Sequence, residues 1–205
     1  MTDPVVVRAA TISDCGLYRY ELARVWDPAL PVLGWIMLNP STADALVDDA
    51  TIRKCMGFAR RASFGGILVT NLFAYRATDP SAMKAASRSG VDIVGRENTN
   101  AIVSAARRCG MTIAAWGANG STIRYTTSVH PRDEMVQLML DAHGLGKRLF
   151  VLRWTKKGSP EHPLYVPYEQ IDTVSQRPLI REKTTAEWSH PDTTTSRNVQ
   201  SPTKS

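Results

Sequence analysis

The sequence of 205 residues contains few cysteines and no long apolar run. Its three cysteines, Cys15, Cys55 and Cys109, are an odd number, lie far apart and form no CxxC pair. This pattern argues against a disulfide framework and favours reduced thiols in a cytoplasmic protein. No run of about 18 apolar residues occurs, so no membrane span is expected. Residues 1–8 also lack the regions of a secretory signal, so none is expected.

Common motifs for phosphate, hydride and metal chemistry are missing as well. The sequence has no GxxxxGK[ST], no GxGxxG after an apolar run, no GxSxG and no HExxH. These absences count against P-loop hydrolysis, dinucleotide-dependent hydride transfer, a hydrolase elbow and zinc-protease chemistry. Asp48 and Asp49 are adjacent carboxylates at the start of a predicted helix, where they complement the helix dipole more often than they bind metal. We therefore expect neither a metal nor a cofactor.

The charge of the chain is basic, with 25 Lys and Arg against 19 Asp and Glu and a formal net charge of +6. Lys and Arg neutralise phosphates, so this balance is compatible with DNA or a nucleotide as partner. The basic residues are spread along the chain in short pairs such as Lys156 and Lys157, and a solvated surface explains them almost as well. Nothing in the sequence sets an oligomeric state.

The apolar pattern predicts an α/β fold. Helical spacing predicts helices over residues 48–62, near 83, over 96–108 and over 133–143, and residues 16–26 are typical of a further strand or hairpin arm. Strands alternating with helices predict a three-layer α/β/α sandwich around a mostly parallel sheet of about four to five strands. Continuous apolar runs predict its buried parallel strands over residues 32–38, 67–73, 111–117 and 148–154.

A single domain accounts for most of the chain. We expect an N-terminal arm over residues 1–15, one α/β domain over 16–172 and a polar C-terminal tail over 173–205. After about residue 180 the chain is rich in Thr and Ser, and it cannot bury enough apolar surface to offset the entropy of ordering. The tail is therefore expected to be disordered.

Polar residues follow the predicted parallel strands. In an open parallel sheet, ligands bind beyond the carboxyl ends of the strands. The sequence therefore predicts one polar site built from residues 39–41, 71–76 and 162–163. Its candidates are Asn39, Pro40, Ser41 and Asp44 after the first strand, Asn71, Tyr75 and Arg76 after the second, and Lys156 and His162 after the fourth.

Each of the main candidates has a structural alternative. Asn39 can simply cap the helix that follows it, because Asn is favoured at helix N-caps. Asn71 can bind backbone groups beside the end of its strand. Arg76 can form a surface ion pair with a nearby aspartate, and His162 can be an exposed loop residue.

Several longer segments carry a resemblance to a known family. They are YRYELARVW, IMLNPSTAD, DDATIRKC, VTNLFAYRATDP, GRENTNAI, AAWG and TKKGSPEHPLYVP, spread over about residues 16–168. On these segments the chain resembles a bacterial and phage family of unknown function, the one numbered 1643. That family brings no established activity with it.

A second and more distant resemblance, to uracil-DNA glycosylases, does imply a function. Residues 37–41, MLNPS, are similar to the G-x-N-P-G segment of the mismatch-specific class. Residues 69–71, VTN, followed by Arg76, look like a V/I-T-N strand and basic loop of related classes, and residues 162–164, HPL, echo their terminal H-P-S. The resemblance implies an α/β/α sandwich of the uracil-DNA glycosylase type.

This resemblance also implies catalytic roles in breaking an N-glycosidic bond. Asn39 would position the attacking water, and a carboxylate such as Asp44 could help as a base. His162 would donate a hydrogen bond to the negative charge that develops on the departing base.

The remaining candidates would bind the substrate. Asn71 would bind the Watson–Crick edge of a flipped base with its paired donor and acceptor. Arg76 and Lys156 would hold phosphates. The set of substrate-binding candidates is completed by Pro40, Ser41 and Tyr75.

The chain departs from the glycosylase motifs in ways that keep other functions open. Met37 and Ser41 replace the two glycines of the first motif, Leu164 replaces the serine of the last one, and residues 164–168 contain no obvious wedge for pushing out a base. The leading hypothesis is a nucleobase-directed N-glycosidic hydrolase or a related nucleic-acid-modifying enzyme. The alternatives are a non-catalytic nucleotide or nucleic-acid binding module, and an enzyme that uses the same residues on a small non-nucleic substrate.

Overall fold

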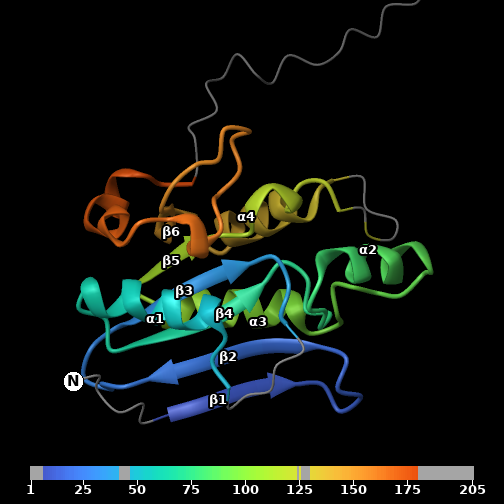
Figure 1. Cartoon of the computed structure of the whole chain (residues 1–205), viewed down its shortest axis with the longest axis horizontal. Coiled ribbons are helices and arrows are strands. Elements are labelled where there is room, and N and C mark those ends of the chain that lie inside the picture. The colour runs from blue at the N-terminus through green and yellow to red at the C-terminus, as the bar shows by residue number, and fades with distance from the viewer. Residues whose placement is uncertain (1–6, 42–46, 124, 126–129, 180–205) are drawn as a thin grey trace, which may run out of the picture.

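The computed structural model describes residues 7–41, 47–123, 125 and 130–179, and its centre is a mixed β-sheet (Figure 1). Within these residues six strands form one sheet in the order β1-β2-β4-β3-β5-β6. Strands β3, β4, β5 and β6 run parallel to one another, whereas β2 is antiparallel to β4 and β1 is antiparallel to β2. The strands are β1 (Val7–Ile12), β2 (Arg19–Val25), β3 (Val32–Met37), β4 (Gly66–Asn71), β5 (Met111–Ala114) and β6 (Leu149–Val151).

The predicted α/β class is confirmed, but the expected strand number is wrong. The four apolar runs form the parallel strands β3, β4, β5 and β6, and residues 16–26 contain β2. The sixth strand is β1, in a segment that we had assigned to an N-terminal arm. It lies at the edge of the sheet with mostly exposed residues, so it lacks the apolar run that marked the other strands.

Helices cover both faces of this sheet. Helix α1 (Ala50–Arg61) and the 3-10 segment η4 (Tyr168–Gln176) pack on one face, which we call the α1 face. Helices α3 (Asn98–Arg108) and α4 (Arg132–Ala142) pack on the opposite face, which we call the α3 face, and α2 (Pro80–Arg88) packs at its edge through Met83 (Figure 1). All four predicted helices are thus present.

The buried side chains of the parallel strands divide between the two faces. In β3, Leu33, Trp35 and Met37 belong to the core on the α1 face, whereas Ile36 belongs to the core on the α3 face. Trp35 contacts Phe58 of α1, with ring centroids 5.8 Å apart. These strands are buried on both faces, and for this reason they are apolar throughout instead of alternating.

The strand order determines where a ligand can bind. Strand β3 comes first among the parallel strands, and the next two strands in the chain, β4 and β5, lie on its two sides. The connections after β3 and β5 therefore diverge at their carboxyl ends, and ligands of open α/β sheets bind at such a switch point.

Among the described residues, no helix combines the length and apolar character needed to cross a membrane. Of the predicted disordered tail over residues 173–205, residues 173–179 are described: η4 extends into them, and Val174 and Leu179 are buried. Residues 180–205 lie outside the described residues.

Candidate functional site

The segments that follow β3 and β4 lie side by side at the carboxyl end of the sheet. Backbone hydrogen bonds join Leu72 N to Met37 O at 2.8 Å and Ala77 N to Pro40 O at 3.0 Å. Residues 39–41 and 71–76, two of the three segments that we predicted to form the site, are therefore neighbours in the structure.

Asn39 holds these two segments together. Its partly buried side-chain amide donates from Nδ2 to the carbonyl oxygens of Pro40 and Ala77, at 3.1 and 2.8 Å. Because these two acceptors orient the amide, Oδ1 is left as an acceptor with no hydrogen-bond partner among the described residues. The helix-capping alternative for Asn39 is wrong, because the N-cap of α1 is Asp49.

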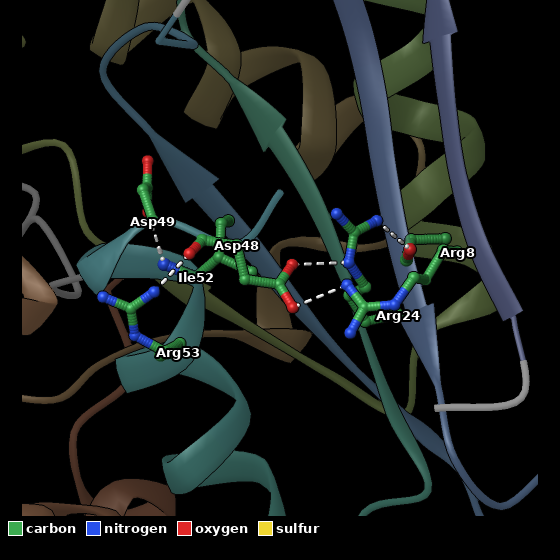
Figure 2. Close-up of polar contacts among 7 residues, drawn as sticks. Arg8, Arg24, Asp48, Asp49, Ile52 and Arg53 are labelled. Carbon is green, nitrogen blue, oxygen red and sulfur yellow. Dashed lines mark hydrogen bonds and ion pairs between the residues drawn. The ribbon is translucent and has the colours of Figure 1, made fainter. Parts of the chain in front are cut away.

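Asp48 and Asp49 precede α1 and point in different directions (Figure 2). Asp49 caps the helix, because its Oδ1 accepts from the backbone N of Ile52 at 2.8 Å. Asp48 turns toward the outer strands and binds Arg24 of β2 at 2.7 Å and Arg8 of β1 at 2.8 Å. Burial would raise the pKa of Asp48, but the hydrogen bonds from Arg24 and Arg8 lower it.

The second oxygen of Asp49 is directed toward the polar residues at the strand ends. Ser41 Oγ, on the segment after β3, lies 3.4 Å from Asp49 Oδ2 and can donate to it. Burial lowers the pKa of His162 and the pKa of Arg19, and the charge of Asp49 opposes part of this lowering in both. The carboxylate that caps α1 thus also interacts with Ser41, His162 and Arg19, a role that the sequence did not indicate.

His162 lies close to α1, because the 3-10 turn that it caps, η3 (Pro163–Tyr165), packs against that helix. Its Nδ1 accepts from Leu164 N at 3.4 Å, so the proton of the neutral ring is on Nε2. Burial lowers the pKa of His162, and the charge of Asp49 opposes this only in part. His162 is partly buried and neutral near pH 7, so the alternative of an exposed loop histidine is wrong.

Asn71 ends β4 with a buried side chain that has an unsatisfied donor. It is 1% exposed, it is paired in register with Met37 on the α1 face, and its Nδ2 has no hydrogen-bond partner among the described residues. The backbone carbonyls at this point are bound by other residues: Asn98 Nδ2 donates to Asn71 O at 3.1 Å and Leu72 O at 2.9 Å, and Arg132 Nε donates to Leu72 O at 3.0 Å. The backbone-binding role that was the alternative for Asn71 belongs to Asn98 and Arg132.

The other predicted binding residues are at the same end of the sheet but have local partners. Arg76 donates from a terminal nitrogen to Gly16 O at 2.9 Å, and the Tyr75 ring packs edge-on against Tyr18 at 6.2 Å. Lys156 is exposed in a turn after β6, where Thr155 N binds Ser159 O. Asp44, the predicted carboxylate, lies outside the described residues.

Sequence reasoning missed Arg19, because a bulge in β2 determines where its side chain points. Ile12 of β1 pairs with Arg19 and Thr11 pairs with Glu21, so Tyr20 has no partner in β1. Tyr20 lies close to Gly95, just before α3, and Glu21 forms an ion pair with Arg108 of α3. Two successive residues therefore face α3, and Arg19 is turned to the α1 face.

Arg19 is the buried cation beside these groups. Its pKa is lowered to about 10, chiefly by burial; Asp49 opposes this lowering, and the nearby charges of Arg76 and Arg24 add to it. In the sequence, Arg19 is one arginine in RYELARV and gives no signal of its own; only the register of β1 and β2 reveals it. We refer to Arg19, Asn39, Ser41, Asp49, Asn71 and His162 together as the strand-end site.

The strand-end site has the composition of an acid-base and hydrogen-bonding site. Within the described ranges, no group of three or more His, Cys, Asp or Glu side chains is placed to hold a metal ion. The site instead combines a fixed carboxylate, a neutral imidazole with a free N–H, an amide acceptor, an amide donor and a buried guanidinium. Such a set can accept a proton, donate hydrogen bonds to a leaving group and bind an anion.

Comparison with known proteins bears on the family of the chain. A family model described as "Protein of unknown function (DUF1643)" matches residues 19–164. Neither a search of curated proteins nor a search of solved structures returned a match, and the resemblance to uracil-DNA glycosylases is not confirmed. The matched range contains every residue of the strand-end site and most of the described fold. The chain belongs to the DUF1643 family.

Proposed function

We propose that this chain is a nucleobase-directed hydrolase that breaks an N-glycosidic bond, on a scaffold of the uracil-DNA glycosylase type. The observation that carries the proposal is the position of Asp49. One of its oxygens is held by the N-terminus of α1, and its charge acts on a neutral histidine, His162, and on a buried cation, Arg19. A carboxylate together with a neutral N–H donor is suited to a reaction in which one part of the substrate becomes positive and the leaving group becomes negative.

Hydrolysis of an N-glycosidic bond has this charge pattern. The bond between the sugar C1′ and the base nitrogen breaks, its electron pair leaves with the base, and the sugar becomes an oxocarbenium ion. Water then adds its oxygen to C1′. Asp49 stabilises the positive sugar and accepts a proton from the water, while Asn39 Oδ1 accepts a hydrogen bond from the same water and orients it.

His162 and Asn71 act on the departing base. His162 Nε2–H donates a hydrogen bond to a base oxygen that gains negative charge as the bond breaks, and because the ring is neutral it assists without a preceding protonation. Asn71 Nδ2 is a buried donor, and leaving such a donor unpaired costs about 1–3 kcal/mol. A carbonyl group of a uracil-like base would satisfy it.

The surroundings of His162 favour a nucleic acid over a free nucleoside as substrate. Leu164 and Tyr165 are exposed and directly follow His162 and Pro163, and Tyr165 is 70% exposed. From the sequence, residues 164–168 contained no obvious wedge. The exposed pair has the apolar character of side chains that enter a base stack where a nucleotide is extruded, so it can act as a wedge.

The test is base release from oligonucleotides carrying uracil, 5-hydroxymethyluracil or mismatched bases, read as strand breaks after alkali. Asp49→Asn is the informative variant, because Asn caps helices as well as Asp but carries no charge. Asp79→Asn is the control, because Asp79 is the N-cap of α2, where its Oδ1 accepts from Ser81 N at 2.8 Å.

The expected result is alkali-labile breaks that Asp49→Asn abolishes and Asp79→Asn preserves. Intact strands with all three substrates would contradict the proposal for DNA. Binding that falls steeply with salt but proceeds without turnover would then indicate a nucleic-acid binding module. The absence of both binding and turnover would favour an enzyme for a small non-nucleic substrate.

A further inference from the structure

The described chain contains three arginines that are more than nine-tenths buried, and Arg19 differs from the other two. Arg24 is 0% exposed and binds Asp48 at 2.7 Å and Ala23 O at 2.8 Å. Arg132 is 6% exposed and binds Leu72 O at 3.0 Å and Thr99 Oγ1 at 3.2 Å. Arg19 is 4% exposed, and the guanidinium has no hydrogen-bond partner among the described residues. The contacts of Arg24 and Arg132 give these two arginines a structural role, whereas the guanidinium of Arg19 makes no such contact with the described residues.

The local charge around Arg19 does not remove the cost of burying it. Asp49 acts on Arg19 from beyond ion-pair distance, while Arg24 and Arg76 repel it. Asp48 is already engaged by Arg24 and Arg8. A guanidinium carries five N–H donors, and buried charges are normally paired or bound to an ion. Arg19 thus has donors without a partner among the described residues, and two further arginines lie near it, so its surroundings suit an anion.

Backbone geometry keeps Arg19 in this position. The bulge at Tyr20 turns it to the α1 face, and Arg19 N donates to Ala74 O at 2.9 Å, on the segment that leaves Asn71. Bulges beside functional sites often redirect one side chain in this manner. On the same face, at the end of β4, Asn71 Nδ2 is a buried donor without a partner among the described residues, which is an independent observation beside Arg19.

We propose that Arg19 binds a phosphate group of the ligand, so that the strand-end site accepts a nucleotide unit and discriminates against the phosphate-free nucleoside. The proposal rests on the proposed function for the identity of the base, but anion binding itself needs no turnover. Arg19 acts as a binding residue with its planar pair of N–H donors on two phosphate oxygens. Asn71 binds a carbonyl group of the same nucleotide.

The experiment measures binding to the full chain by calorimetry and by thermal shift at constant ionic strength. The probes are inorganic phosphate, 2′-deoxyuridine 5′-monophosphate and, as the neutral comparison, deoxyuridine. The variants are Arg19→Gln, which removes the charge, and Arg19→Lys, which keeps the charge but loses the two-pronged geometry. Arg132→Gln is the control for loss of a buried arginine whose contacts are all structural.

We expect the wild type to bind the monophosphate at least about tenfold more tightly than deoxyuridine, and Arg19→Gln to lose this difference. Arg19→Lys should retain only part of it. Without ligand, Arg19→Gln should melt at the wild-type temperature or above it, because an unpaired buried charge is removed, whereas Arg132→Gln should melt lower. Equal binding of both probes by the wild type, or unchanged monophosphate binding by Arg19→Gln, would overturn the proposal.

This experiment also separates the two proposals. If phosphate binding depends on Arg19 but no base is released from any oligonucleotide, the anion site stands and the hydrolase is refuted. If base release is found and Arg19→Gln leaves both binding and turnover unchanged, the hydrolase stands and the role of Arg19 is refuted.

Discussion

Replacing Asp49 separates the two roles that the structure gives this residue. As the N-cap of α1 it accepts from Ile52 N at 2.8 Å, and as a charge it acts on His162 and Arg19. Asp49→Ala removes both roles. Asp49→Asn removes only the charge, because Asn is as good an N-cap as Asp.

The expected stability change follows from the cap. Loss of an N-cap side chain costs about 1 kcal/mol, within a range of about 0.5–2 kcal/mol. For a domain of about 150–250 residues this lowers the melting temperature by roughly 2–4 °C. Asp49→Ala should show this loss, and Asp49→Asn should melt within about 1 °C of the wild type. Asp79→Ala, at the N-cap of α2, provides the same measurement away from the site.

The expected electrostatic change is a lower pKa for His162 in both Asp49 variants, because the charge that raises it is gone and burial continues to lower it. The assay is an NMR titration of the histidine ring protons, with His143 and His130 as internal references outside the site. A pKa of His162 that is unchanged in Asp49→Asn would refute the electrostatic interaction between these two residues. Equal destabilisation by Asp49→Asn and Asp49→Ala would refute the assignment of stability to the cap alone.

Three further predictions follow from the same contacts. Asn39→Ala removes hydrogen bonds to Pro40 O and Ala77 O, so it should lower the free energy of unfolding, measured by denaturant titration, by about 2 kcal/mol, and it should also reduce activity. Unchanged stability would show that Asn39 does not hold these segments together. His162 has a lower pKa in the folded protein than its unfolded value of 6.5, so the unfolded chain binds more protons and stability should fall as the pH drops below about 6.5. In His162→Gln this part of the pH dependence should vanish. If it persists, another group is responsible for it. Asp48→Ala leaves the fully buried Arg24 without this carboxylate, so by the same titration it should cost about 3 kcal/mol or more. Asp172→Ala breaks an exposed pair with Arg61 and should cost much less; equal costs would show that the Asp48–Arg24 pair has no structural role.

Much of the fold could be predicted from local patterns. The runs at 32–38 and 67–73 are apolar throughout because strands β3 and β4 are covered on both faces, and this burial is visible in the sequence itself. Helical spacing identified α1 through Ile52, Cys55 and Met56, which are all buried on one side of the helix. The edge strand β1 escaped the same reasoning, because a strand with one partner and mostly exposed residues has no distinctive apolar pattern.

The candidate site divides in the same way. Sequence alone determined that polar residues follow the apolar strands, because a chain that leaves a buried parallel sheet must expose polar groups at its carboxyl edge. Only the tertiary structure decided which carboxylate and which cation are at the centre. Asp49 had been assigned to the helix dipole alone, and its second role depends on η3 packing against α1 from more than 100 residues away in the chain. The position of Arg19 depends on the bulge at Tyr20 in β2. The register of β1 and β2 is set by pairing between separate segments, and no local sequence pattern predicts it.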